Sequence, residues 1–77
     1  MATKKATVLK RTAFQKLIGW SGGKPAITKV EPPVTKEPGV TFDVDDGIIT
    51  SSAVPPKQYY WVFGTEFYVK KNDVKLS

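Results

Sequence analysis

The segment from residue 59 to residue 70 constrains the fold more than any other part of the sequence. Two runs rich in aromatic and β-branched residues, 59–63 and 66–70, flank the dipeptide Gly64-Thr65. Such residues favour strands, and a two-residue loop that begins with glycine favours a type II′ hairpin turn. Both faces of this hairpin are apolar, so the rest of the chain must cover at least one of them. The predicted cross-strand pairs are Val62 with Phe67 and Tyr60 with Val69 on one face, and Trp61 with Tyr68 and Tyr59 with Lys70 on the other.

The material that can cover this hairpin is limited, because the whole chain has 77 residues. A chain of that length forms one domain with a small core. It has no cysteine and no histidine, which excludes disulfides, thiolate metal sites and imidazole bases. Hydrophobic residues make up 40% and aromatic residues 12% of the chain, too much for an intrinsically disordered protein. We therefore expect a small folded domain held together by packing alone.

Three further stretches have the pattern of strands. Residues 40–44 alternate apolar and polar side chains, and residues 48–53 follow after Asp46-Gly47, a dipeptide typical of tight hairpin turns. This pattern predicts a second hairpin with Val44 opposite Ile49. Short strands are also expected over 26–30 and 74–76, with the proline-rich residues 31–39 as an exposed connector.

Residues 6–18 are the one stretch in which the spacing favours a helix. Its apolar residues fall on one stripe at helical spacing, and the glycines from residue 19 onward supply a stop. Lys10 interrupts the stripe, and the β-branched residues Thr7, Val8 and Thr12 make a strand the alternative. The stripe consists of Ala6, Leu9, Ala13, Leu17 and Trp20, widened by Phe14 and Ile18.

Together these elements predict a mainly β fold of the α+β class. We expect four or five short strands in a small antiparallel sheet or partly open barrel, covered by one N-terminal helix. Residues 1–77 form a single domain in this prediction. Residues 1–23 are its basic, helical segment and residues 24–77 its β-rich body.

Charge is distributed unevenly along the chain. Residues 1–30 hold seven basic residues and no acidic one, whereas residues 31–56 hold five acidic residues and one lysine. A basic segment without acids is attracted to polyanions or to an acidic protein surface. Eleven of the twelve basic residues are lysine, which disfavours base-specific reading of DNA because that is mainly a task of arginine. The predicted basic partner-binding residues are Lys4, Lys5, Lys10, Arg11 and Lys16.

The outer face of the 59–70 hairpin is the second predicted partner-binding site. Its aromatic residues lie next to Lys57, Lys70 and Lys71. Aromatics among cations can stack single-stranded bases, and a flat aromatic patch can anchor a protein partner. The third alternative is that the helix covers this face and makes it core. The predicted aromatic partner-binding residues are Tyr59, Trp61, Phe63 and Tyr68.

No motif in the sequence indicates catalysis, a cofactor or a metal ion. Counting a calcium loop from Asp43 places Gly47 at position 5 and Val54 at position 12, where an EF-hand needs glycine at 6 and glutamate at 12. Residues 21–24 contain glycines and a lysine but lack phosphate-loop spacing. We therefore expect a protein that is not an enzyme and has no cofactor and no metal site.

The apolar runs are too short for a membrane span. The longest is 59–63, against the roughly 20 residues that a spanning helix needs, so no membrane insertion is expected. The N-terminus lacks the apolar stretch of a secretory signal, which predicts an intracellular or virion-associated location. Residues 2–18 loosely match the composition of an organellar presequence, an alternative that would leave a domain near the lower size limit.

These observations predict a non-enzymatic structural, assembly or adaptor protein. It would dock onto a larger complex, for example a lattice or a virion, through the basic N-terminal residues and the aromatic face. The partner would be an acidic protein or another copy of the chain. The alternative is a sequence-tolerant module that binds single-stranded nucleic acid with the N-terminal lysines and the Trp61 face.

Overall fold

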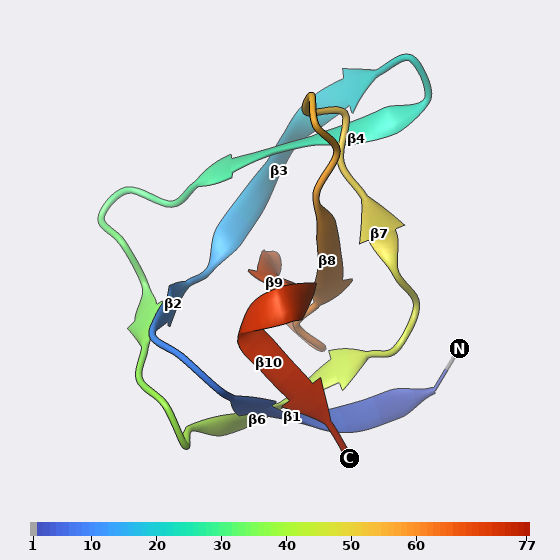
Figure 1. The fold of residues 1–77 in the computed structure, drawn as a ribbon. Helices are drawn as coiled ribbons and strands as arrows, with labels where there is room; N and C mark the ends of the chain where they lie inside the picture. The colour runs from blue at the N-terminus through green and yellow to red at the C-terminus, as the bar shows by residue number, and fades with distance from the viewer. Residues whose placement is uncertain (1) are drawn as a thin grey trace.

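The computed structural model describes residues 2–77, which form three antiparallel sheets around one core (Figure 1). The sheets have the strand orders β10-β1-β6, β2-β5 and β4-β3-β9-β8-β7. The elements are β1 (Thr3–Val8), β2 (Thr12–Ala13), β3 (Gln15–Ser21), β4 (Lys24–Lys29), β5 (Thr35–Lys36), β6 (Thr41–Asp45), β7 (Ile49–Thr50), β8 (Gln58–Trp61), β9 (Phe67–Lys70), the 3₁₀ turn η1 (Lys71–Asp73) and β10 (Val74–Leu76).

The predicted N-terminal helix is wrong, and with it the α+β class. Residues 6–18 run through β1, β2 and β3, and the only helical element in residues 2–77 is η1. The buried side chains follow the period of a strand, because Ala6 and Val8 point inward from β1 while Thr7 between them is half-buried. Leu9 and Trp20, which belong to the helical stripe, are exposed. The protein is therefore a small β-rich domain.

The core lies between the sheets and uses one face of the 59–70 hairpin. Phe14, just before β3, is 5% exposed and packs edge-on against Phe42 of β6, with ring centroids 5.0 Å apart and an interplanar angle of 88°. Its ring also lies 5.7 Å from that of Phe67. This aromatic contact joins β6 and β9 to the segment between β2 and β3. The buried cluster is Ala6, Val8, Phe14, Val44, Tyr60, Val62, Val69 and Val74.

The predicted 59–70 hairpin is confirmed as β8 and β9. Tyr59 lies opposite Lys70, Tyr60 opposite Val69 and Trp61 opposite Tyr68. The turn itself lies one residue earlier than predicted, because the amide of Thr65 donates to the carbonyl of Val62 at 3.1 Å. Gly64 thus occupies the third position of the turn with φ of +78°, as a type II turn requires, so the predicted type II′ turn is wrong.

The conformation of Gly64 leads to a stability prediction. A residue with a Cβ resists a positive φ, and a β-branched residue resists it most. We expect Gly64→Val to lower the free energy of unfolding by about 1–2 kcal/mol, measured by urea denaturation. Gly19→Val is the matched control, because it adds the same side chain at a glycine that has open space around it and no positive φ. An unchanged stability of Gly64→Val would mean that the turn lies elsewhere.

The predicted hairpin over 40–53 is wrong, although its strands exist. β6 pairs with β1 and β7 pairs with β8, so the two strands belong to different sheets. Asp45 accepts a hydrogen bond from the amide of Gly47 at 2.8 Å, and Asp46 accepts one from the amide of Ala2 at 3.0 Å. The Asp-Gly segment therefore carries the chain from one sheet to the next. The strands predicted over 26–30 and 74–76 are confirmed as β4 and β10.

Candidate binding surface

Four of the five predicted basic residues form ion pairs within the protein. Their partners are far away in the sequence and lie on other strands or turns, so these charges are largely neutralised before any partner arrives. Lys4, exposed on β1, takes part in none of the ion pairs found in residues 2–77. The pairs are Lys5 with Asp43 at 2.9 Å, Lys10 with Asp73 at 3.5 Å, Arg11 with Glu37 at 3.2 Å, and Lys16 with Glu66 at 3.8 Å.

The four predicted aromatic residues do not form one continuous face. Tyr59 is only 3% exposed, and its hydroxyl donates to Oε1 of Gln15 at 3.1 Å. Trp61 and Tyr68 are half-buried and line a separate hollow of about 250 Å³. Phe63 is 53% exposed, with its ring centroid 5.3 Å from that of Trp61. The structure thus keeps Trp61, Phe63 and Tyr68 near the surface and removes Tyr59 from it.

Burial raises the pKa of the Tyr59 hydroxyl above its usual value of 10. A raised pKa in the folded state means that the folded protein holds this proton more tightly than the unfolded chain does. The resulting stabilisation is complete below pH 10 and is lost as the pH rises through the folded-state pKa.

We therefore expect the melting temperature to fall more steeply above pH 10 in the wild type than in Tyr59→Phe. The variant has no hydroxyl to ionise, which removes that pH dependence, although it also loses the hydrogen bond to Gln15 at every pH. Thermal melts from pH 8 to pH 11 measure the difference. Parallel pH curves for the two proteins would contradict the assignment.

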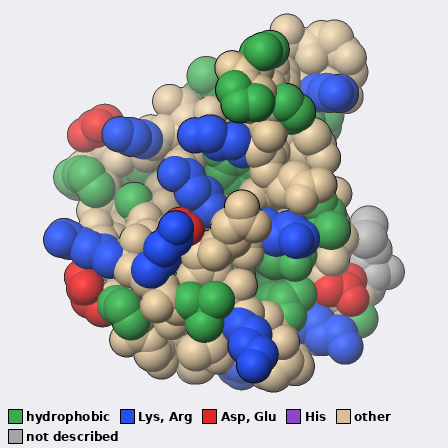
Figure 2. All heavy atoms as spheres, in the orientation of Figure 1, with side chains coloured by type: hydrophobic (Ala, Val, Ile, Leu, Met, Phe, Trp, Pro, Cys, Tyr) green, Lys and Arg blue, Asp and Glu red, His purple; other side chains and the backbone are tan. Residues whose placement is uncertain are grey.

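Two hollows lined by lysines form a basin, and Figure 2 shows several lysine or arginine side chains across the middle of the face that it draws. The basin consists of two adjoining hollows of about 430 and 470 Å³, and Lys57 and Lys70 line both. Lys10 adds a charge to the first hollow and Lys29 to the second. We call this site the lysine basin and define it by Lys10, Lys29, Lys57 and Lys70.

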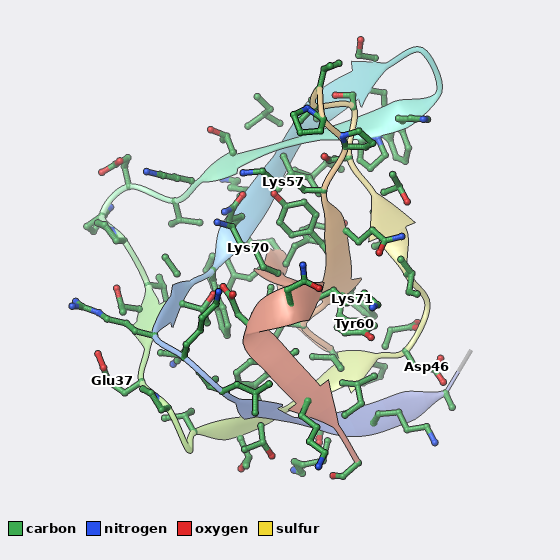
Figure 3. The ribbon with its side chains drawn as sticks, viewed as in Figure 1. Glu37, Asp46, Lys57, Tyr60, Lys70 and Lys71 are labelled. Atoms are coloured by element: carbon green, nitrogen blue, oxygen red, sulfur yellow. The ribbon has the colours of Figure 1, made fainter. Side chains whose placement is uncertain are left out.

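Local structure explains why these lysines meet. Lys70 ends β9 opposite Tyr59 and therefore projects from the outer face of the sheet, away from the core residue Val69. Lys57 precedes β8, and its amide donates to Oγ of buried Ser51 at 3.2 Å, which ties the 51–57 loop back onto the sheet. Figure 3 shows Lys57 and Lys70 on the same side of the molecule, with Lys71 nearby.

The basin has an excess of positive charge. Its two acidic residues are Asp73 and Glu31. Asp73 is 7% exposed, accepts a hydrogen bond from Oγ1 of Thr12 at 2.7 Å and pairs with Lys10. Among the residues that the structure describes, Lys57 and Lys70 take part in no ion pair. The basin can therefore accept carboxylate or phosphate groups.

The sequence places Lys57 and Lys70 next to the aromatic face and does not predict a basin around them. The pattern of the 59–70 hairpin does contain the signal for Lys70, because it places this residue opposite Tyr59. It contains no signal for the approach of Lys10, in the bend after β1, or of Lys29, at the end of β4. The exposed side chains of Ile18 and Trp20 were also missed, since the helical stripe had assigned Trp20 to the core.

The structure adds two observations on membranes and metals. Within residues 2–77 there is no helix long and apolar enough to cross a membrane. The same residues contain no group of three or more carboxylates placed to hold a metal ion.

Comparisons with protein-family models, with curated proteins and with solved structures found no match to this chain.

Proposed function

We propose that this protein is a non-enzymatic assembly or adaptor module that docks onto an acidic protein segment of a larger complex. A lattice or a virion is an example of such a complex. The observation that carries the proposal is the lysine basin, where Lys57 and Lys70 lie between two adjoining hollows without an acidic partner among the described residues. The proposed contact therefore involves the lysine basin and not the basic N-terminal residues that the sequence predicted.

An extended acidic segment fits the shape of the basin better than a single small anion does. The two hollows share Lys57 and Lys70, each is open to solvent, and each has one further lysine in its lining. Successive carboxylates of a peptide can therefore each meet an ammonium group. Complementary charge of this kind speeds association and selects the partner more than it raises affinity.

The sequence-tolerant nucleic-acid module is the second candidate. It is supported by the preference of lysine for phosphate as a point charge and by the exposure of Phe63 beside Trp61. It is weakened by the burial of Tyr59, because the one aromatic residue that lines the basin offers no free ring for base stacking. We therefore place the acidic protein segment first.

The test is a binding titration of the double variant Lys57→Gln/Lys70→Gln with a short polyglutamate peptide. Each exposed ion pair contributes about 0.2–1 kcal/mol, so losing two should weaken binding about fivefold. Lys4→Gln/Lys75→Gln is the matched control, because it removes the same charge from exposed residues outside the basin. Equal loss in both variants would show attraction by net charge alone and would contradict the basin.

The same proteins distinguish the second candidate in a salt titration against a short oligothymidylate. If nucleic acid is the partner, log K should fall with log salt by about 0.7 per phosphate contact, and the basin variant should lower that slope by about 1.4. Tight oligothymidylate binding with weak polyglutamate binding would replace the acidic protein by nucleic acid. Failure of the wild type to bind either probe at low salt would overturn both candidates.

A further inference from the structure

The end of the β3–β4 hairpin projects from the body of the protein with large apolar side chains on its surface (Figure 1). β3 pairs with β9 only through Gln15 and Lys16, so its later residues pair with β4 alone. Trp20 is 69% exposed and Ile18 is 65% exposed. An exposed tryptophan on a projecting hairpin is unusual for a protein that acts alone, since tryptophan is the residue most enriched among interface anchors.

The hairpin is well held, so Trp20 is presented in a defined position. Its turn has Gly22 and Gly23 at φ of +59° and +80°, conformations that glycine adopts without strain. On the β4 side, the carbonyl of Pro25, opposite Trp20, accepts a hydrogen bond from the amide of Ser52 at 2.9 Å. Because the backbone that carries Trp20 is already held in place, ordering this backbone adds little to the entropy cost of binding.

The same protein carries a hollow that suits one large apolar side chain. It has a volume of about 250 Å³, slightly below the range of small-molecule pockets. Ile48, 52% exposed, forms part of its wall. We call it the Trp61 pocket, and it is lined by Asp45, Gly47, Ile48, Ile49, Trp61 and Tyr68.

The charges around the hairpin and the pocket are complementary. The β3–β4 hairpin contains Lys24 and no acidic residue, whereas Asp45 lines the Trp61 pocket and Asp46 follows it. Neither aspartate takes part in the ion pairs of residues 2–77. A second copy of the chain therefore offers this pocket an aromatic anchor that is close in sequence to a cation, of opposite sign to the two carboxylates.

We propose that Trp20 of one copy inserts into the Trp61 pocket of a second copy. Each copy then presents one anchor and one pocket, so the contact drives self-association. The proposal goes beyond the docking function above and involves none of the lysines of the basin. The two proposals can therefore fail independently of each other.

The experiment measures the mass of the purified protein by sedimentation up to about 1 mM, the weak limit of specific contacts. Wild type should associate. Trp20→Ala and Ile48→Lys should each raise the dissociation constant about thirtyfold, the size of a hot-spot loss. Leu9→Lys, a similar change at a 56% exposed position away from both surfaces, is the control and should associate like the wild type.

Mixing the two variants provides the decisive step. Trp20→Ala keeps its pocket and Ile48→Lys keeps its anchor, so an equimolar mixture retains one complete contact and should form heterodimers but no larger species. Far-UV circular dichroism of each variant shows that the fold is intact. The proposal is overturned if the wild type is monomeric at every concentration, if either variant associates like the wild type, or if the mixture contains only monomers.

Discussion

Replacing Phe14 with alanine is expected to lower the free energy of unfolding by about 3–5 kcal/mol, the usual cost of removing a buried phenylalanine. The ring is 5% exposed and contacts Phe42 of β6 and Phe67 of β9, which belong to two different sheets. Its outer side is covered by Lys36, whose ammonium nitrogen lies 5.4 Å from the ring centroid.

A domain of this size has only about 3–5 kcal/mol of stability from its core, so Phe14→Ala should be largely unfolded at 25 °C. Urea denaturation followed by circular dichroism measures the loss. Phe63→Ala is the matched control, because it removes the same side chain at a position that is 53% exposed and should cost less than about 1 kcal/mol. Equal losses in the two variants would show that Phe14 is not at the centre of the core.

The second large effect is expected at Thr12, which is 4% exposed at the start of β2. Its hydroxyl donates to the carboxylate of Asp73 at 2.7 Å, joining the first strands to the 3₁₀ turn. Thr12→Val keeps the shape of the side chain but leaves that carboxylate without its donor. Because hydrogen bonds to charged groups are the stronger kind, we expect a loss of about 1.5–3 kcal/mol.

A urea titration of Thr12→Val and Thr12→Ser checks this prediction. Thr12→Ser keeps the donor and should lose clearly less stability than Thr12→Val. In a double-mutant cycle with Asp73→Ala, the effects should be far from additive, since the two side chains share one contact. Additive effects, or a larger loss in the serine variant, would mean that Thr12 contributes by packing and not by its hydroxyl.

The ion pairs of the basic N-terminal residues change how the role of these residues should be interpreted. Surface ion pairs such as Lys5 with Asp43 and Arg11 with Glu37 contribute little to stability, but they reduce the charge that is available to a partner. Lys57 and Lys70 take part in none of the ion pairs of residues 2–77, and both line the same basin. This is why the proposed contact involves Lys57 and Lys70.

Local sequence was sufficient to predict the 59–70 hairpin and its register, because two adjacent strands and the turn between them need no distant partner. The same holds for the positive φ of Gly64, although the turn lies one residue earlier than predicted. The alternation of side chains across β8 and β9 also indicated correctly that Tyr60, Val62 and Val69 share one face.

Tertiary structure decided the rest. Residues 6–18 fit a helix by spacing, yet β1 finds its partners in residues 41–45 and 74–76, and those distant strands supply the backbone hydrogen bonds that a helix would have made locally. The ion pairs of Lys5, Lys10, Arg11 and Lys16 likewise join residues that are distant in sequence. Burial and charge pairing depend on which segments meet in space, and so the lysine basin and the exposed Trp20 appear only in the folded protein.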